Sequence, residues 1–209
     1  MYKLLVLDLD GTLTNSKKEI PEHNLDTFLR AQEKGLRIVL ASGRPTYGIT
    51  PLAEQLQLER FGGYILSFNG GQIIDCQTNK VIYETVLDPA HYDYLYEQGN
   101  TDDFKIISYE DNYIVGEDIE NEYIKYEAFL NKMPLKKVEN FRKHFNCPLP
   151  KCLVVGEPTK LAELEKKMYE KLKDVMSVYR SEPFFLELLP LGIDKAKSLA
   201  VLLERIGLT

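Results

Sequence analysis

The amino-acid sequence predicts an α/β fold: a parallel-sheet core into which an α+β segment is inserted. Three observations predict it. Short apolar runs alternate with helical patterns up to residue 68, short strands and separate helices follow from residue 69, and a helical pattern returns after residue 194. The initial β-α-β-α-β order implies right-handed crossovers and a parallel sheet with helices on both faces.

The core elements follow from hydrophobic periodicity. Residues 2–9 are apolar on both faces of a strand, which is typical of a central parallel strand. Residues 21–34 place apolar side chains on one helical stripe that ends at Gly35. Pro51 interrupts the next stripe, so this helix is expected to begin near Thr50 or to be kinked. The expected core elements are strands at 2–9, 36–41 and 64–68 and helices at 21–34 and near 50–56.

The middle of the chain reads as a separate α+β unit. A hairpin pattern spans residues 73–84, and strands then mix with helices rather than alternating with them. The elements expected after the hairpin are helices at 88–98, 118–130, about 160–172 and 194–206 and strands at 104–109, 113–117, 152–155, 175–179 and 184–188. The sequence therefore predicts a discontinuous core, residues 1–84 and 188–209, and an inserted domain at 85–187.

Composition narrows the classes of function. The formal net charge of -6 argues against a nucleic-acid or anionic-membrane partner, although a local cationic pocket for an anionic substrate remains compatible with it. Three cysteines without metal-type spacing indicate reduced thiols. No signal-type or membrane-spanning apolar run is evident, and we expect a cytoplasmic protein.

Two aspartates end the first strand, in the stretch VLDLDGTLT. Residues i and i+2 of a strand point to the same face, so Asp8 and Asp10 place two carboxylates side by side. Ligands bind at the carboxyl ends of strands in open parallel sheets. Because two adjacent carboxylates repel, a cation must neutralise them, and Mg²⁺ takes one or two carboxylates together with water and substrate phosphate. The pair therefore indicates a metal and a phosphate.

Two other interpretations of the aspartates are weaker. An EF-hand loop would place Glu19 at its twelfth position, but Leu13 stands where that loop requires glycine, and a strand rather than a helix leads in. A plain polar turn accounts for Gly11 but gives no reason for two aspartates.

Other strand ends carry polar residues. Ser42 and Gly43 follow the second strand and offer a hydroxyl and free N–H groups to a phosphate, while Arg44 adds charge or pairs with a carboxylate. Asn69 follows the third strand, where Asn-Gly is first a signal for a tight turn. Lys195 begins the last helix, where a lone lysine is usually solvated.

Taken together and in this order, these motifs resemble those of the haloacid dehalogenase superfamily of phosphohydrolases. More narrowly, they resemble its Cof-type members, which have a Rossmann-like core and a large α/β cap inserted after the third core strand. Ala196 stands where the family usually has a glycine, a mild departure. The matching stretches are DLDGTL at 8–13, LASGR at 40–44, SFNGG at 67–71 and LELLPLGIDKAKSL at 186–199.

The resemblance implies a catalytic pair. Asp8 would be the nucleophile that forms an aspartyl-phosphate, and Asp10 would protonate the leaving alcohol and then activate water. Asp8 and the main-chain carbonyl of Asp10 would hold Mg²⁺.

The resemblance also implies a phosphate-binding set. Ser42 and the Gly43 amide would hold the transferring phosphoryl group, Lys195 would neutralise its charge, and the Leu9 and Gly11 amides would be further donors.

One family feature is missing from the sequence. Family members continue to another core strand with a fourth, acidic motif that completes the Mg²⁺ site, whereas residues 196–209 contain no aspartate and only one glutamate, Glu204. Since the missing strand would pair with residues 2–9, that segment would become an exposed edge through which chains can associate. We therefore expect a truncated chain that binds metal poorly and turns over slowly.

The sequence thus predicts a Mg²⁺-dependent phosphatase of small phosphorylated metabolites, in particular sugar phosphates. Two alternatives stay open. One is a catalytically inactive binding or regulatory module, and the other is a phosphomutase that passes the phosphoryl group to a second hydroxyl.

Overall fold

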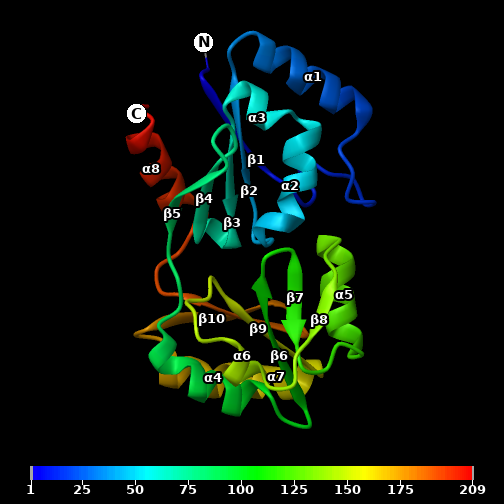
Figure 1. The fold of residues 1–209 in the computed structure, drawn as a ribbon, viewed down its shortest axis with the longest axis vertical. Helices are drawn as coiled ribbons and strands as arrows, with labels where there is room; N and C mark the ends of the chain where they lie inside the picture. Colours follow the sequence, from blue (N-terminus) through cyan, green and yellow to red (C-terminus); the bar gives the residue numbers. More distant parts are fainter. Residues whose placement is uncertain (1, 209) are drawn as a thin grey trace. The chain divides into compact units, whose positions relative to one another are not determined.

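The computed structural model describes residues 2–208, which form two compact units (Figure 1). Unit 1 comprises Met1–Glu84 and Asp194–Thr209, and unit 2 comprises Thr85–Ile193. The chain returns to unit 1 after residue 193, whereas the sequence pattern placed this return at 188. The reason is that strand β11 (Phe185–Pro190) stays within the sheet of unit 2 over its whole length.

Unit 1 is built on a five-stranded sheet in the order β1-β2-β3-β4-β5. The first three strands are parallel, and β4 and β5 extend the sheet as an antiparallel hairpin. This confirms the α/β class and the expected hairpin after the third strand. The strands are β1 (Leu4–Asp8), β2 (Arg37–Ala41), β3 (Tyr64–Ser67), β4 (Gln72–Asp75) and β5 (Lys80–Glu84).

Helices cover both faces of this sheet (Figure 1). Helices α1 (Glu22–Glu33), α2 (Thr46–Gln55) and α3 (Leu58–Phe61) pack on one face around a core that includes Leu40 and Ile65. Helix α8 (Lys195–Arg205) packs on the other face through Leu202. The helical residues that the sequence places on one apolar stripe are the ones that face the sheet.

One of the two expectations for the helix that contains Pro51 was wrong. Helix α2 begins at Thr46 rather than near Thr50 and contains Pro51, because the proline removes only one intrahelical hydrogen bond, to the Tyr47 carbonyl, near the helix start. As expected for a sheet that lacks the further core strand, β1 lies at the edge of the sheet formed by the described residues, where it pairs with β2 and leaves Val6 37% exposed.

Unit 2 contains a six-stranded sheet in the order β10-β11-β9-β6-β7-β8. Neighbouring strands are antiparallel except for the parallel pair β7 and β8. Beside β11, its strands are β6 (Phe104–Glu110), β7 (Tyr113–Gly116), β8 (Leu135–Lys137), β9 (Cys152–Gly156) and β10 (Met176–Glu182). The expected α+β organisation of this segment is confirmed.

The two faces of the second sheet are covered differently. Helices α4 (Tyr92–Gly99), α6 (Phe141–His144) and α7 (Pro158–Leu172) share one apolar core on one face (Figure 1). Tyr109 lies on the opposite face, because side chains alternate along β6, and there it bonds Glu127 of α5 (Glu122–Asn131).

Three features of unit 2 differ from expectation. Helix α5 begins at Glu122 rather than at Asp118, because the Asn121 side chain accepts hydrogen bonds from the Tyr123 and Ile124 amides and caps the helix there. Strand β8 and helix α6 were not anticipated, since both are too short for a periodic pattern.

No helix within residues 2–208 is long and apolar enough to cross a membrane.

Candidate active site

The predicted site residues of unit 1 meet at the carboxyl ends of its parallel strands. Asp8 ends β1 and pairs in register with Ala41, directly before Ser42. The Ser42 amide donates to the carbonyl of Leu66 in β3 (2.9 Å), and the Asn69 amide donates to the Ser42 carbonyl (3.0 Å). Backbone hydrogen bonds thus tie the segments after β2 and β3 to each other, beside the end of β1.

A tight turn follows Asp8. Leu9 is fully buried, and its carbonyl accepts the amides of Leu13 and Thr14 as well as the Thr14 hydroxyl. Gly11 has a φ of 76°, in the region that favours glycine. Since the Leu9 side chain points into the core, only the backbone of this residue is available to a ligand.

Lys195 is the residue that the last helix delivers to the site. Its ammonium nitrogen forms an ion pair with Asp8 Oδ1, although the two residues are 187 positions apart in the sequence. Asp194 caps α8 by accepting from the Lys197 amide (2.7 Å), which places Lys195 in the first turn. The Lys195 and Asp8 side chains are 40% and 44% exposed, so the pair is open to solvent and to a ligand.

Asp10 is held by two cations from different segments. Lys18 Nζ lies 2.7 Å from Asp10 Oδ1, and Arg44 Nη2 lies 2.6 Å from the same oxygen. Arg44 Nε also donates to Asp10 Oδ2 over 3.2 Å. Burial raises the pKa of Asp10, but hydrogen bonds from Arg44 and Lys18 outweigh that effect and leave its pKa below the usual 3.8. The carboxylate form is therefore favoured.

Ser42 and Gly43 form a compact corner with Asn69. Ser42 is 3% exposed, and its Oγ accepts the Arg44 amide (3.2 Å). A Cβ on Gly43 would lie 2.9 Å from Asn69 Oδ1, so the Asn69 side chain would have to shift to admit one. Phe68 and Asn69 have φ angles of 50° and 59°, an unusual pair of left-handed residues. Such strain is concentrated at functional sites.

Helix α8 is locked to this strained loop. The buried Ser198 hydroxyl donates to the Gly70 carbonyl (2.7 Å), three residues along the helix from Lys195. A Cβ on Gly70, whose φ is 95°, would meet the Ser198 side chain. The loop that carries Asn69 and the helix that carries Lys195 are therefore in direct contact through Gly70 and Ser198.

The structure brings the predicted site residues together and places two further side chains, Lys18 and Ser198, against them. The structure gathers Asp8, Asp10, Ser42, Gly43, Arg44, Asn69 and Lys195, with the backbone of Leu9 and Gly11, at one sheet edge. Lys18 and Ser198 were not anticipated. The Asn15 turn was the available signal for Lys18, whereas the sequence gives none for Ser198, an ordinary helical serine.

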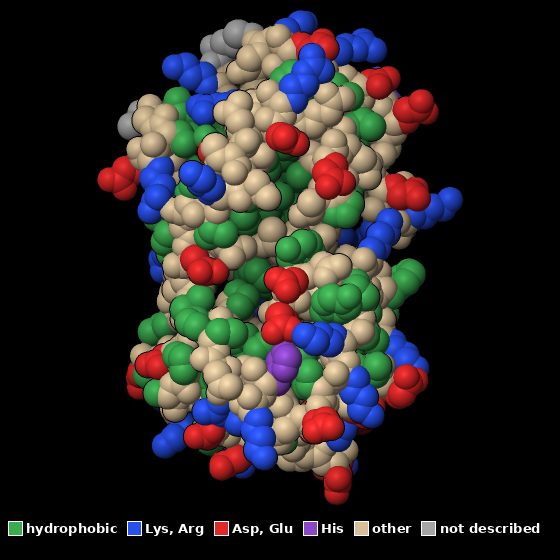
Figure 2. Space-filling view, in the orientation of Figure 1, with side chains coloured by type: hydrophobic (Ala, Val, Ile, Leu, Met, Phe, Trp, Pro, Cys, Tyr) green, Lys and Arg blue, Asp and Glu red, His purple; other side chains and the backbone are tan. Residues whose placement is uncertain are grey.

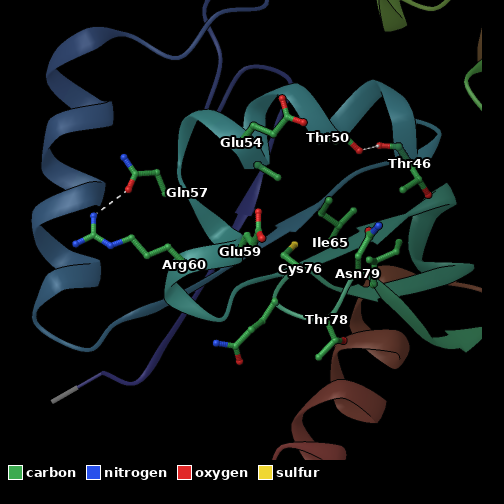
Figure 3. Close-up of a pocket in the computed structure, with 13 residues that line it drawn as sticks. Thr46, Thr50, Glu54, Gln57, Glu59, Arg60, Ile65, Cys76, Thr78 and Asn79 are labelled. Carbon is green, nitrogen blue, oxygen red and sulfur yellow. Dashed lines mark hydrogen bonds between the residues drawn. The ribbon is translucent and has the colours of Figure 1, made fainter.

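A separate groove of about 920 Å³ lies on unit 1 between α2, α3 and the β4–β5 hairpin (Figure 3). It contains none of the predicted site residues. Its charged lining residues are Glu54, Glu59 and Arg60, so it is not suited to a phosphate. Burial raises the pKa of the Cys76 thiol in its wall to about 12, which leaves the sulfur unreactive.

Unit 2 contains a polar cluster of another kind. Lys151 Nζ lies 2.9 Å from Glu187 Oε2, and both side chains are almost fully buried. Nearby, the Tyr109 hydroxyl donates to Glu127 Oε1 (2.7 Å). Desolvation raises the pKa of Glu127, as it raises that of Tyr109.

On the surface, acidic and basic side chains are interspersed over the face of the molecule drawn in Figure 2.

Comparison with known proteins shows the family to which this chain belongs. Residues 5–209 match the family described as haloacid dehalogenase-like hydrolase. The chain belongs to that family. The resemblance to Cof-type members of the haloacid dehalogenase superfamily is thereby confirmed.

Three relatives illustrate the similarity of this haloacid dehalogenase-like hydrolase to known proteins. A haloacid dehalogenase-like hydrolase from Bacteroides thetaiotaomicron is 51% identical, with a TM-score of 0.97, and the match covers 100% of this chain and 79% of that one. YxeH of Bacillus subtilis is 28% identical over 100% of this chain and 77% of its own length. The 5-amino-6-(5-phospho-D-ribitylamino)uracil phosphatase YcsE of the same organism is 25% identical, and the match covers 99% of this chain and 73% of YcsE.

Proposed function

We propose that this hydrolase releases phosphate from small phosphorylated metabolites, with sugar phosphates as the leading class. The observation that carries the proposal is the meeting of Asp8, Ser42 and Lys195 at one sheet edge, with the lysine ammonium on the Asp8 carboxylate. A nucleophile, a hydroxyl donor and a cation are what phosphoryl transfer needs, because its catalysis is mainly positioning and charge stabilisation. The name of YcsE, a phosphatase of a small phosphorylated metabolite, agrees with it.

The chemistry divides between the two aspartates. An Asp8 oxygen attacks phosphorus, the bond from phosphorus to the ester oxygen breaks, and the leaving alkoxide takes a proton from Asp10. Water then attacks the aspartyl-phosphate and gives a proton to Asp10, which restores Asp8 and frees phosphate. The ion pairs of Asp10 favour its carboxylate form, which suits the second step, and a bound phosphate adds negative charge that raises the pKa of Asp10 for the first.

Polar groups and one cation stabilise the phosphoryl oxygens. The Ser42 hydroxyl and the Gly43 amide donate hydrogen bonds to them, and Asn69 stands against Gly43 as a further polar contact. Lys195 leaves Asp8 for the substrate, which frees the nucleophile as it neutralises the incoming charge. Because this pair is open to solvent, the exchange of partners has a small energetic cost.

The donor set fits a Mg²⁺ ion held by few protein ligands. The Asp8 carboxylate is 44% exposed and already binds a cation, the Lys195 ammonium. The Asp10 side chain is paired with Lys18 and Arg44, so its main-chain carbonyl, rather than its carboxylate, would hold the ion. Within residues 2–208 no group of three or more His, Cys, Asp or Glu side chains is arranged to hold a metal. When bound, the ion supplies charge neutralisation for the phosphate, and we expect weak binding.

We further propose that unit 1 is the catalytic core and unit 2 a cap that selects the substrate. The site residues named above all belong to unit 1. Unit 2 has its own sheet and apolar core, as expected of an inserted domain. Substrate selection by unit 2 predicts that changes to its surface alter KM among substrates and leave the chemistry of Asp8 intact.

The test is phosphate release by the 209-residue chain from a panel of sugar phosphates and other phosphomonoesters at saturating Mg²⁺. Asp8→Asn is expected to lower kcat/KM on the order of 10⁴-fold or more while the chain stays folded. Asp26→Asn, on the exposed side of α1, is the matched control and should keep full activity. The absence of release by the unaltered chain, or release that survives Asp8→Asn, would contradict the proposal. Transfer to a second hydroxyl without free phosphate would indicate a mutase.

A further inference from the structure

Lys18 reaches Asp10 from a turn that lies outside every motif described above. Its ammonium nitrogen is 2.7 Å from Asp10 Oδ1, the oxygen that also accepts from Arg44 Nη2. Because Arg44 Nε bonds the other oxygen, both carboxylate oxygens of Asp10 are fixed by cations. These cations come from the segments after β1 and after β2, so the carboxylate is restrained from two directions.

Asn15 organises the turn that presents Lys18. The Asn15 Oδ1 atom accepts the amides of Lys17 (2.8 Å) and Glu19 (3.1 Å), and its carbonyl accepts the Lys18 amide (2.9 Å). The Asn15 amide in turn donates to the Glu19 carbonyl (2.9 Å). The turn is therefore closed by four hydrogen bonds and holds Lys18 in one place.

The backbone of Lys18 is in an unusual conformation. Its φ is 61°, in the left-handed region that a lysine adopts only at an energetic cost. Buried residues on either side, Thr14 and Ile20, anchor the ends of the turn in unit 1. A glycine or asparagine would relieve the strain, but neither could deliver a cation to Asp10.

The bland alternative is a solvated lysine that happens to lie near a carboxylate. Lys17 shows what that looks like in this turn: it is exposed and has no ion-pair partner within the described residues 2–208. The Lys18 side chain is only 30% exposed. An exposed ion pair adds little to stability, so stability alone does not account for a strained backbone that serves it.

We propose that Lys18 is a positioning residue: together with Arg44 it holds the Asp10 carboxylate in the orientation required for proton transfer, without touching the substrate. This inference rests on the proposed function, in which Asp10 is the proton-transfer group. It adds to the site a residue that acts through Asp10 alone. Removing Lys18 should therefore leave substrate binding intact and slow the chemistry.

The kinetic test compares Lys18→Met with Lys17→Met in the 209-residue chain. Lys18→Met is expected to lower kcat about 10-fold with KM within about 2-fold of the unaltered chain, because it loosens one general acid–base group. Lys17→Met should change neither constant. Lys18→Arg should recover most of kcat, since it restores the cation. In an Asp10→Asn background, Lys18→Met should cause no further loss, because the group it positions is gone.

A structural readout keeps the test independent of turnover. A crystal structure of Lys18→Met, compared with one of the unaltered chain, should show the Asp10 side chain turned away from the orientation in which Arg44 bonds both of its oxygens. An unmoved Asp10, an unchanged kcat, or an equal loss in the Asp10→Asn background would overturn the inference. An unaltered chain that releases no phosphate would overturn the proposed function instead, while a moved Asp10 side chain would still support the role of Lys18 in holding it.

Discussion

Lysine–carboxylate pairs occur in both units of this hydrolase, in opposite environments. In unit 1, Lys195 and Asp8 are 40% and 44% exposed. In unit 2, Lys151 and Glu187 are 3% and 9% exposed. A pair open to solvent can exchange its partner for a ligand at small cost, whereas in a sealed pair the loss of either member leaves the other charge buried without its counter-charge. Exposure therefore distinguishes a pair that a ligand can reach from a pair that is closed to solvent.

The sealed cluster is also more completely bonded. Glu187 Oε1 accepts the Ser181 hydroxyl (3.0 Å), and Lys151 Nζ lies over the Tyr109 ring, 5.1 Å from its centroid. The Tyr109 hydroxyl in turn donates a hydrogen bond to Glu127 of α5. The cluster thus joins helix α5 to the sheet of unit 2. None of its members has a motif in the sequence.

The largest contrast is expected from removing one lysine in each cluster. Lys195→Met should lower kcat/KM about 10²–10³-fold and change the free energy of unfolding by less than about 1 kcal/mol. Lys151→Met should lower the free energy of unfolding by about 3–5 kcal/mol, because Glu187 is left buried without its cation. Urea unfolding and phosphate release measure the two quantities.

A double variant controls this contrast. Lys151→Met combined with Glu187→Leu removes both buried charges and should recover most of the lost stability. The comparison fails if Lys195→Met unfolds the chain, or if Lys151→Met is as stable as the original.

A smaller effect is expected where the open site depends on its strained loop. Gly70→Ala should lower the free energy of unfolding by about 1–3 kcal/mol, because a Cβ there would lie 2.8 Å from Ser198 Cβ at a φ of 95°. Activity should fall as well, since Ser198 and Lys195 share α8. Gly35→Ala, at a φ of 89° with nothing within 4 Å, isolates the backbone cost and should leave activity unchanged. Equal losses of activity in the two variants would argue against coupling through α8.

The sealed cluster should also give stability a pH dependence through Glu127. Burial raises the pKa of Glu127 above its ordinary value near 4.5, so the folded chain holds this proton more tightly than the unfolded chain. Its contribution to stability is full below that ordinary value and is lost as the pH rises through the folded-state pKa. Glu127→Gln has no proton to lose, so its stability relative to the original should increase with pH over that window. Parallel urea-midpoint profiles would contradict this.

The smallest effect is expected at Asp10, with the opposite sign. The pKa of Asp10 is lowered in the folded chain, so its contribution is present above the ordinary value of 3.8 and is lost as the pH falls. Because the side chain is 43% exposed, Asp10→Asn should cost less than about 1 kcal/mol at neutral pH. A loss as large as that of Lys151→Met would place Asp10 among the structural charges.

The sequence specified the fold through periodicity and chain order. Strands and helices of unit 1 were predictable because their apolar patterns are long and regular, and parallel strand ends bring Asp8, Ser42 and Asn69 together. The start of α2 was not, because Pro51 is tolerated inside a helix whose apolar face is well packed. Strand β8 and helix α6 are held by tertiary contacts rather than by a local pattern.

The meeting of the candidate site residues was predictable where they stand in a motif, whereas contacts made by residues outside the motifs were not. Lys195 contacts Asp8, which is far away in the sequence, and only the family resemblance predicted that the two residues belong to one site. Lys18 depends on the backbone of the Asn15 turn, and Lys151 on burial that no local pattern encodes.

One measurement tests the central claim most directly. The 209-residue chain is mixed with substrate and Mg²⁺, quenched in acid within a single turnover, digested, and analysed by mass spectrometry. The account predicts one phosphoryl group on the peptide that contains Asp8, absent from Asp8→Asn and lost with time as phosphate appears. Phosphate release with no phosphoryl group on that peptide, or with the group on another residue, would contradict it.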